Sequence, residues 1–404
     1  MYRLVGKRII LGVTGGISAY KAAFLVRLLR KNGADIRIVM TQNATKFVTP
    51  LTFQALSSKS VYTELLDLDT ETAMSHIELA RWADLILIVP ASANFIARYA
   101  FGLAEDLLST ICLATDSPVA IAPSMNQQMW LNVATQDNIK KISRRGIHII
   151  GPAIGEQACG EDGPGRMLEP EEIVKYAANI FQTDILTGSR LLVTAGPTRE
   201  AIDPIRFLSN RSSGRMGYAV ATAAVEAGAD VTLISGPVNL QAIGIDKVIN
   251  VTSAAEMYES VMHEISSIDI FISAAAVADF RAQRISEQKI KKSQDVNELI
   301  LEKTPDILFH VSGLHDAPFT VGFAAETEDL ESNAQEKMFL KNLDMIAANQ
   351  VGERKGIDSD ENALTVFWKT GNEQLPLTSK NKLARHLIKL IAQQYNEKNS
   401  NKTH

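Results

Sequence analysis

The sequence is short of cysteine, of positive charge and of long apolar runs, and each shortage excludes a class of protein. Its two cysteines, Cys112 and Cys159, cannot form a disulfide framework or a zinc site with four thiolate ligands. The net charge of -5 at pH 7 argues against a nucleic-acid partner or an anionic membrane, because both would favour a basic chain. No stretch approaches the roughly 18 consecutive apolar residues that a membrane-spanning helix needs. We therefore expect a cytoplasmic protein with reduced thiols.

The composition is typical of a globular protein, and the length is typical of one with more than one domain. Of its 404 residues, 46% are apolar and 22% are charged, so a packed core is expected. The length is long for one domain and comfortable for two.

Two parts of the chain share one pattern: a buried strand, a Gly-rich turn, a helix closed by glycine, and a second strand. One part runs from "RIILGVTGG" (8–16) to "GADIRIVMT" (33–41), and the other from "RLLVTAGPTRE" (190–200) to "GADVTLISG" (228–236). This βαβ pattern predicts α/β domains with doubly wound, Rossmann-like parallel sheets that bind ligands at the carboxyl ends of their strands. Further strands are expected at 83–92, 118–124, 148–152, 268–276 and 319–327. We place the boundary near residue 189, which gives domains 1–189 and 190–404.

The turn "GVTGGISAYK" (12–21) has neither the G-x-G-x-x-G of dinucleotide folds nor the G-K-[ST] of a P-loop. It nevertheless places Gly15 and Ser18 at a helix N-terminus, where backbone N–H groups attract phosphate. A tight turn with a Ser or Thr cap is an equally good interpretation of this segment alone. A second turn with small polar residues, "PASAN" (90–94), follows another expected strand and favours a mononucleotide site.

Three further residues are candidates for chemistry. His76 stands near a helix start, where most histidines are surface or capping residues. Asn126, in "PSMNQQMW", follows an expected strand and could equally be a helix cap. Cys159 lies in the polar, Gly-rich "ACGEDGPGRM" (158–167), whereas Cys112 in "STICLAT" has the apolar neighbours typical of a structural thiol.

In combination these motifs are recognisable. "GVTGGISAYK", "SHIEL", "PASAN", "PSMNQQMW" and "ACGEDGPGRM" together resemble the flavin-dependent cysteine decarboxylases, and "TAGPTRE", "SNRSSGRMG", "AAAVADF" and "KIKK" resemble phosphopantothenate–cysteine ligase. The whole chain, over about residues 5 to 395, thus resembles the bacterial bifunctional enzymes of coenzyme A biosynthesis.

For the first domain the resemblance implies a flavodoxin-like fold that binds FMN and decarboxylates 4'-phospho-N-pantothenoyl-L-cysteine to 4'-phosphopantetheine. Oxidation of the cysteinyl thiol to a thioaldehyde would give the departing electron pair a C=S sink. His76 would be the base, Asn126 would hold the carboxylate and amide, and Cys159, on a mobile flap, would protonate the enethiol. The FMN contacts implied are Gly15, Ser18, Thr41, Ser92 and Asn94.

For the second domain the resemblance implies that CTP activates 4'-phosphopantothenate as an acyl-cytidylate, which the amine of L-cysteine then attacks. Lys289 would neutralise charge on the phosphates, Mg²⁺ would bridge them, and Asn210 would handle the intermediate. The remaining nucleotide contacts implied are Ser273, Ala274, Ala275, Asp279, Pro305, Asp306, Ile307, Leu308, Phe323, Lys337 and Lys341. The protein ligands of the metal are not identified, and the preference for CTP over ATP rests on the resemblance alone.

The resemblance also implies a homo-oligomer in which decarboxylase trimers and ligase dimers build a larger particle, a dodecamer. Two other classes remain as alternatives. One is a flavoprotein that regulates a partner without catalysis, against which Asn126 and Cys159 argue. The other is an NAD-dependent reductase, against which the missing G-x-G-x-x-G argues.

Overall fold

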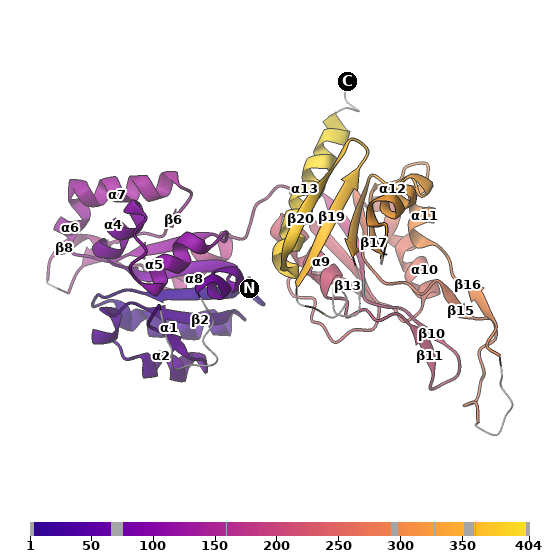
Figure 1. Cartoon of the computed structure of the whole chain (residues 1–404), viewed down its shortest axis with the longest axis horizontal. Helices are drawn as coiled ribbons and strands as arrows, with labels where there is room; N and C mark the ends of the chain where they lie inside the picture. The colour runs from indigo at the N-terminus through magenta and orange to yellow at the C-terminus, as the bar shows by residue number, and fades with distance from the viewer. Residues whose placement is uncertain are drawn as a thin grey trace. The chain divides into compact units, whose positions relative to one another are not determined.

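The chain folds as two α/β units, Met1–Phe181 and Gln182–His404, each built around one central sheet (Figure 1). The computed structural model describes residues 4–65, 76–158, 160–291, 298–326, 328–350, 359 and 361–400. No helix within these ranges is long and apolar enough to cross a membrane.

The sheet of the first unit has the order β3-β2-β1-β4-β5-β6, and all its neighbouring strands are parallel. The strands are β1 Arg8–Val13, β2 Asp35–Met40, β3 Val61–Tyr62, β4 Leu85–Ala91, β5 Val119–Pro123 and β6 His148–Ile149. Without the two-residue edge strand β3, the order is that of the flavodoxin-like fold, so the predicted fold class is confirmed. The chain changes direction across the sheet between β1 and β4, which is where such folds bind ligands.

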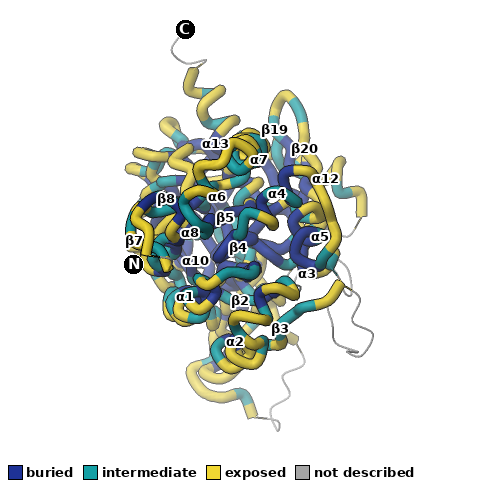
Figure 2. The backbone as a smooth tube through the Cα atoms, turned by 90° about the vertical axis from the view of Figure 1, so that its left-hand side faces the viewer, coloured by how far each residue is buried: buried dark blue, intermediate teal, exposed yellow. Residues whose placement is uncertain are grey.

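The helices of this unit cover both faces of the sheet and leave its central strands β1, β4 and β5 buried. They are α1 Ala19–Lys31, α2 Pro50–Ser57, α3 His76–Trp82, α4 Ala93–Phe101, α5 Leu107–Ala114, α6 Gln127–Leu131, α7 Val133–Arg144 and α8 Pro170–Asn179, with a 3₁₀ turn at Ala44–Lys46. A hairpin of β7 (Ala153–Glu156) and β8 (Asp162–Arg166) precedes α8. Figure 2 shows the buried strands β4 and β5 among half-exposed helices.

Alternate side chains of β1 enter two different cores, as the period of a strand requires. Ile9 and Leu11 pack with apolar residues of α1 and α8, whereas Ile10 packs with those of α3, α4 and α5. Each fully buried aliphatic side chain contributes about 1.5–3 kcal/mol. Gly12 allows α5 to approach, because a Cβ at this position would lie 2.6 Å from Leu108 Cδ1.

The sheet of the second unit has the order β13-β12-β9-β14-β17-β18-β19-β20. Its strands are β9 Arg190–Ala195, β12 Asp230–Ser235, β13 Lys247–Asn250, β14 Ile270–Ser273, β17 Phe319–Glu326, β18 Met345–Gln350, β19 Glu361–Trp368 and β20 Gly371–Ser379. From β13 to β18 the neighbours are parallel and follow the Rossmann order, which confirms the predicted doubly wound sheet. β19 and β20 extend it with an antiparallel hairpin that the sequence analysis did not predict.

Helices again cover both faces of this sheet. α9 (Arg215–Glu226) and α13 (Lys380–Ser400) share one core, and α10 (Ala254–Glu264), α11 (Ile307–Ser312) and α12 (Leu330–Leu340) share the other, with a 3₁₀ turn at Ile265–Ser267. Two small antiparallel pairs, β10 (Arg199–Ala201) with β11 (Phe207–Ser209) and β15 (Phe280–Ala282) with β16 (Leu301–Lys303), stand apart from the sheet.

The segment between Phe181 and β9 packs on the second unit. The N–H groups of Thr183 and Leu186 donate to the carbonyls of Glu226 and Ala227 at 3.0 and 2.8 Å, and the Leu186 side chain is 2% exposed within the α9 core. The expected boundary near residue 189 therefore lies a few residues inside the second unit as the structure divides it.

A pair of fragments tests where the boundary lies. We expect residues 182–404 to unfold several degrees above residues 190–404, because the shorter fragment loses about 2 kcal/mol of Leu186 burial. Thermal unfolding followed by circular dichroism measures both. Residues 1–189 should unfold cooperatively on their own. Equal melting temperatures for the two longer fragments would contradict the assignment of 182–189 to the second unit.

Candidate active sites

A cavity of about 990 Å³ lies where β1, β2, β4 and β5 end in the first unit. Its size is within the range of about 300–1,000 Å³ that cofactor and ligand sites occupy. The lining includes all five residues predicted to contact FMN, namely Gly15, Ser18, Thr41, Ser92 and Asn94, together with Asn126.

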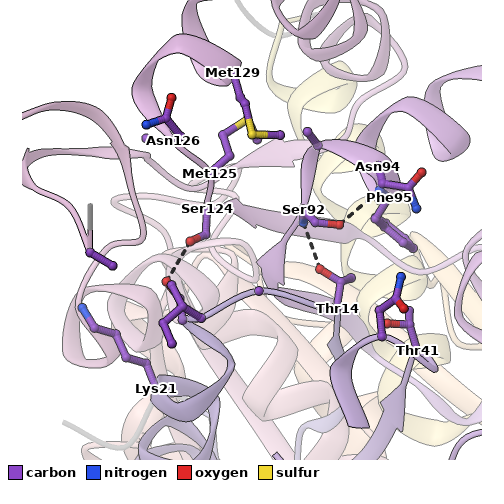
Figure 3. A pocket seen from close by; sticks show the side chains of 18 of the residues that line it. Thr14, Lys21, Thr41, Ser92, Asn94, Phe95, Ser124, Met125, Asn126 and Met129 are labelled. Carbon is purple, nitrogen blue, oxygen red and sulfur yellow. Dashed lines mark hydrogen bonds between the residues drawn. The ribbon is translucent and has the colours of Figure 1, made fainter. Parts of the chain in front are cut away.

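Thr14 joins the two strand ends that flank the change of direction in the sheet. Its hydroxyl donates to the carbonyl of Pro90 at 2.8 Å and accepts from the N–H of Ser92 at 2.9 Å. Ser92 then accepts from the N–H of Phe95 and caps α4 (Figure 3). The two turns predicted to form one site are therefore held together by side-chain hydrogen bonds.

The turn before α1 leaves its polar groups directed at the cavity. Ser18 is the N-cap residue, but its side chain makes no capping hydrogen bond and instead lies 2.8 Å from the hydroxyl of Ser124. Gly15 is required by close approach, because a Cβ there would lie 2.5 Å from the Cβ of Asn43. Glycine backbone and hydroxyl groups at a helix N-terminus fit a phosphate, so the residues present fit a mononucleotide such as FMN.

Cations at one wall give the cavity a positive side. Lys21, 13% exposed, and Arg166 each lie 2.8 Å from Glu169 Oε1. The hydrogen bond from Lys21 holds the pKa of Glu169 below its usual range, against the effect of burial. Two cations share one carboxylate, so this wall favours an anion.

The orientation of the Asn126 amide is fixed by its own helix. Oδ1 accepts from the N–H of Gln128 at 2.8 Å, which directs Nδ2 away from α6. Nδ2 donates to Glu161 Oε2 at 2.8 Å. Asn126 thus caps α6 through Oδ1 and donates through Nδ2 to the carboxylate of Glu161.

Residues 162–166 of the Gly-rich segment predicted to be a flap form β8, which pairs with β7 beside Asn126. The N–H of Met125 donates to the carbonyl of Gly165 at 3.0 Å, and a Cβ on Gly165 would lie 2.4 Å from Met125 O. Ala158 lines the cavity. Cys159 itself lies outside the described residues, so its predicted role stays a prediction.

His76 is the one predicted decarboxylase residue with a described position that does not line this cavity. It is half-buried at the first residue of α3. Cys112, in contrast, is buried among the apolar residues behind the sheet, and burial raises the pKa of its thiol.

A second cavity, of about 760 Å³, lies at the carboxyl ends of β14 and β17 in the second unit. Asn210 lines it, and so do the other predicted nucleotide contacts except Lys289, namely Ser273, Ala274, Ala275, Asp279, Pro305, Asp306, Ile307, Leu308, Phe323, Lys337 and Lys341. The segment "SNRSSGRMG" contributes backbone and side chains from Asn210 to Gly217.

Two lysines give this cavity positive charge: Lys337 lies in α12, and Lys341 directly follows that helix. Lys341 lies 2.6 Å from Asp306, and this contact holds the pKa of Asp306 below its usual range although burial opposes it. Lys337 donates to the carbonyl of Phe323 at 3.3 Å. Burial, and then the charge of Lys341, lower the pKa of Lys337. A polyanion would relieve that repulsion.

Asn210 and Lys289 have different surroundings. The Nδ2 of Asn210 donates to the carbonyls of Ala276 and Val277 at 3.1 Å each, which fixes the orientation of this amide at the cavity wall. Lys289 is exposed between β15 and β16, next to Ile290, whose N–H donates to Asp203. Within the described ranges, no group of three or more His, Cys, Asp or Glu residues could hold a metal ion.

Comparison with known proteins agrees with this division of the chain. Residues 2–182 match the family described as Flavoprotein, and residues 186–395 match the DNA/pantothenate metabolism flavoprotein C-terminal domain. The coenzyme A biosynthesis bifunctional protein CoaBC of Vibrio cholerae is 55% identical over 399 residues, which are 98% of this chain and 100% of that relative. This chain belongs to the coenzyme A biosynthesis bifunctional protein family.

Other members are similarly close. The CoaBC protein of Escherichia coli K12 is 50% identical over 402 residues, 98% of this chain and 99% of that relative. A crystal structure of the C-terminal domain of a CoaBC protein is 39% identical, with a TM-score of 0.46, and covers 53% of this chain and 100% of that domain. Family membership favours an enzyme over both alternatives weighed from the sequence.

Two further residues of the cavity were not predicted from the sequence. Ser124 lies beside Ser18 on the cavity wall, and Lys21 supplies charge near the hairpin. Both stand inside motifs that were recognised, Ser124 two residues before Asn126 and Lys21 at the end of "GVTGGISAYK".

The lowered pKa of Lys337 predicts a stability that depends on pH. The unfolded chain holds this proton more tightly than the folded chain, so the free energy of unfolding rises with pH from the lowered pKa to the ordinary value of about 10.5. We expect Lys337→Met to raise the melting temperature at pH 7 and to lose that gain near pH 10.5. The exposed Lys389→Met is the control. A Lys337→Met variant that melts lower than wild type at pH 7 would contradict the assignment.

Proposed function

We propose that the cavity of the first unit binds FMN and decarboxylates 4'-phospho-N-pantothenoyl-L-cysteine. The cavity of the second unit, in this proposal, joins L-cysteine to 4'-phosphopantothenate with CTP. The observation that carries the first assignment is the Asn126 amide, whose Nδ2 donates to a carboxylate at the edge of the cavity. The membership of the whole chain in one bifunctional family supports the pairing of the two reactions.

FMN bound here would supply the two-electron oxidation of the substrate thiol and the matching reduction at the end. The residues predicted to hold it are Gly15, Ser18, Thr41, Ser92 and Asn94, all on the cavity wall. Lys21 and Arg166 add positive charge on the side of the hairpin, which suits a phosphorylated substrate.

The protein groups divide the decarboxylation into proton and carboxylate handling. Asn126 donates to the substrate carboxylate and orients its bond to the α-carbon. From the thioaldehyde, carbon dioxide would leave as its bonding pair passes to the C=S group; this gives an enethiolate, which becomes the enethiol when its sulfur takes up a proton. His76 is assigned to accept the thiol proton, and Cys159 to give a proton to the enethiol carbon in the closing reduction.

The ligase site needs charge compensation more than acid–base chemistry. Lys337, Lys341 and the proposed Lys289 would oppose the charge of CTP as the carboxylate of 4'-phosphopantothenate displaces pyrophosphate. Asp279 offers an exposed carboxylate on the cavity wall, the kind of ligand that Mg²⁺ accepts, so Mg²⁺ would be held by Asp279 together with the phosphates. Asn210 presents Oδ1 to the acyl-cytidylate that cysteine then attacks.

Assembly into a homo-oligomer is part of the proposal. His76 and Lys289 lie outside the cavity linings of their own chain, so a neighbouring copy could supply them. Exposed apolar side chains beside the first cavity, Ile17, Tyr20 and Phe24 on α1 and before it, offer a surface for such a contact. The trimers, the dimers and the dodecamer, like a cytoplasmic location, remain predictions.

The role of Cys159 predicts a stalled reaction. Cys159→Ser should oxidise and decarboxylate the substrate but stop before the last reduction, because serine is too weak an acid to protonate the enethiol. We expect reduced flavin and an accumulated enethiol, followed by absorbance and mass spectrometry. Cys112→Ser, at the buried thiol, is the control and should turn over. Normal formation of 4'-phosphopantetheine by Cys159→Ser would refute the role.

Asn210 and Lys289 should fail at different steps of the ligation. Lys289→Gln removes a charge from phosphate stabilisation, so pyrophosphate release should fall about a thousandfold. Asn210→Asp should still form acyl-cytidylate but hinder its conversion by cysteine. Rapid quench with labelled phosphopantothenate measures the intermediate in each variant. An intermediate that accumulates in Lys289→Gln but not in Asn210→Asp would reverse the two roles.

A further inference from the structure

Glu161 stands where the proposed substrate places its own charge. The carboxylate accepts from Asn126 Nδ2 at 2.8 Å and from Gln127 Nε2 at 3.4 Å. Asn126 lines the cavity, whereas Glu161 belongs to the turn between β7 and β8 outside the lining. The carboxylate of Glu161 thus accepts from the Asn126 amide. The proposed function assigns this same amide to the carboxylate of the substrate.

The hairpin is set in register for this contact. Gln157 faces Glu161 across the turn, and its N–H donates to the carbonyl of Glu161 at 2.8 Å. The Gln157 side chain accepts from the N–H of Gln127 at 3.0 Å and donates to the carbonyl of Pro164 at 3.1 Å. Gly163 packs closely against Gln127, because a Cβ on residue 163 would overlap Gln127 Oε1. The backbone around Glu161 is therefore tied to the segment that carries Asn126.

Two carboxylates cannot share this nitrogen at low cost. The cap bond from Gln128 fixes Oδ1, so the amide has no second orientation to offer. A substrate carboxylate on the same Nδ2 would lie within about 5 Å of Glu161, and two negative charges at that distance repel. Although Nδ2 carries two hydrogens, this repulsion makes the two carboxylates compete for the amide.

We propose that Glu161 is a specificity-determining residue that occupies the carboxylate position of Asn126 until the acid substrate displaces it. The inference rests on the proposed function of this cavity. The product has lost its carboxylate and does not compete for the amide, so Glu161 returns to Asn126 as product leaves. The contact thereby lowers the affinity for the acid while leaving that for the product unchanged.

Two unreactive ligands separate these effects. The seryl analogue of the substrate, 4'-phospho-N-pantothenoyl-L-serine, keeps the carboxylate but has no thiol to oxidise. The corresponding ethanolamine amide lacks only the carboxylate. Isothermal titration of both into the full-length, FMN-loaded protein measures their affinities, and flavin absorbance checks that each variant is folded and loaded.

Glu161→Ala should bind the seryl acid about tenfold more tightly than wild type if Glu161 occupies the amide about nine-tenths of the time. The ethanolamine amide should bind within about twofold of wild type. Asp162→Ala removes a neighbouring exposed charge without touching Asn126 and should change neither affinity beyond that range. In an Asn126→Ala background, Glu161→Ala should have no effect on the acid.

Other results overturn the inference. Unchanged or weaker acid binding in Glu161→Ala would show that the residue does not compete. Equal tightening for both ligands, or the same tightening in Asp162→Ala, would assign the effect to hairpin opening or to net charge. A wild-type protein that binds neither ligand would instead refute the proposed decarboxylase function, so the two failures are distinguishable.

Discussion

Burial of the central parallel strands on both faces is the constraint from which the rest of the structure follows. Ile9 and Ile10, or Leu191 and Leu192, enter opposite cores, so neither face of these strands has room for polar chemistry. Hydroxyl, amide and charged groups can gather only where strands end and helices begin. Both cavities lie at such edges, and the hydroxyl of Thr14 joins the two strand ends that define the first.

The two edges are equipped for different reactions. The first combines a turn whose groups fit a phosphate with an amide whose orientation is set by its own helix cap, which suits recognition of a carboxylate that must leave. The second holds two lysines close together, and burial, followed by the charge of Lys341, lowers the pKa of Lys337. Keeping Lys337 charged there costs stability in the folded protein, and bound phosphates would offset part of that cost. A single scaffold thus serves carboxylate release in one unit and carboxylate activation in the other.

The central parallel strands were predictable because most of them are apolar runs, several of which are followed by a turn of small residues. The hairpin β19–β20 was not, since its alternating exposed and buried residues give no long apolar run. The predicted lining residues follow strand ends and therefore meet in space. His76 and Lys289 do not line either cavity. A motif shows which residue is present, but not which side of the folded chain the residue lies on, nor whether it acts in its own chain or in a neighbouring copy. The contact between Asn126 and Glu161 also escaped prediction, since it depends on how a hairpin folds back.

The central claim is that each cavity carries one of two separable activities. A coupled reaction with phosphopantothenate, CTP and carboxyl-labelled cysteine measures pyrophosphate and labelled carbon dioxide separately. In Asn126→Asp, which places a carboxylate against the substrate's own, pyrophosphate should form at the wild-type rate while labelled phosphopantothenoylcysteine accumulates without carbon dioxide. Loss of both products together, or carbon dioxide released at the wild-type rate, would contradict the account.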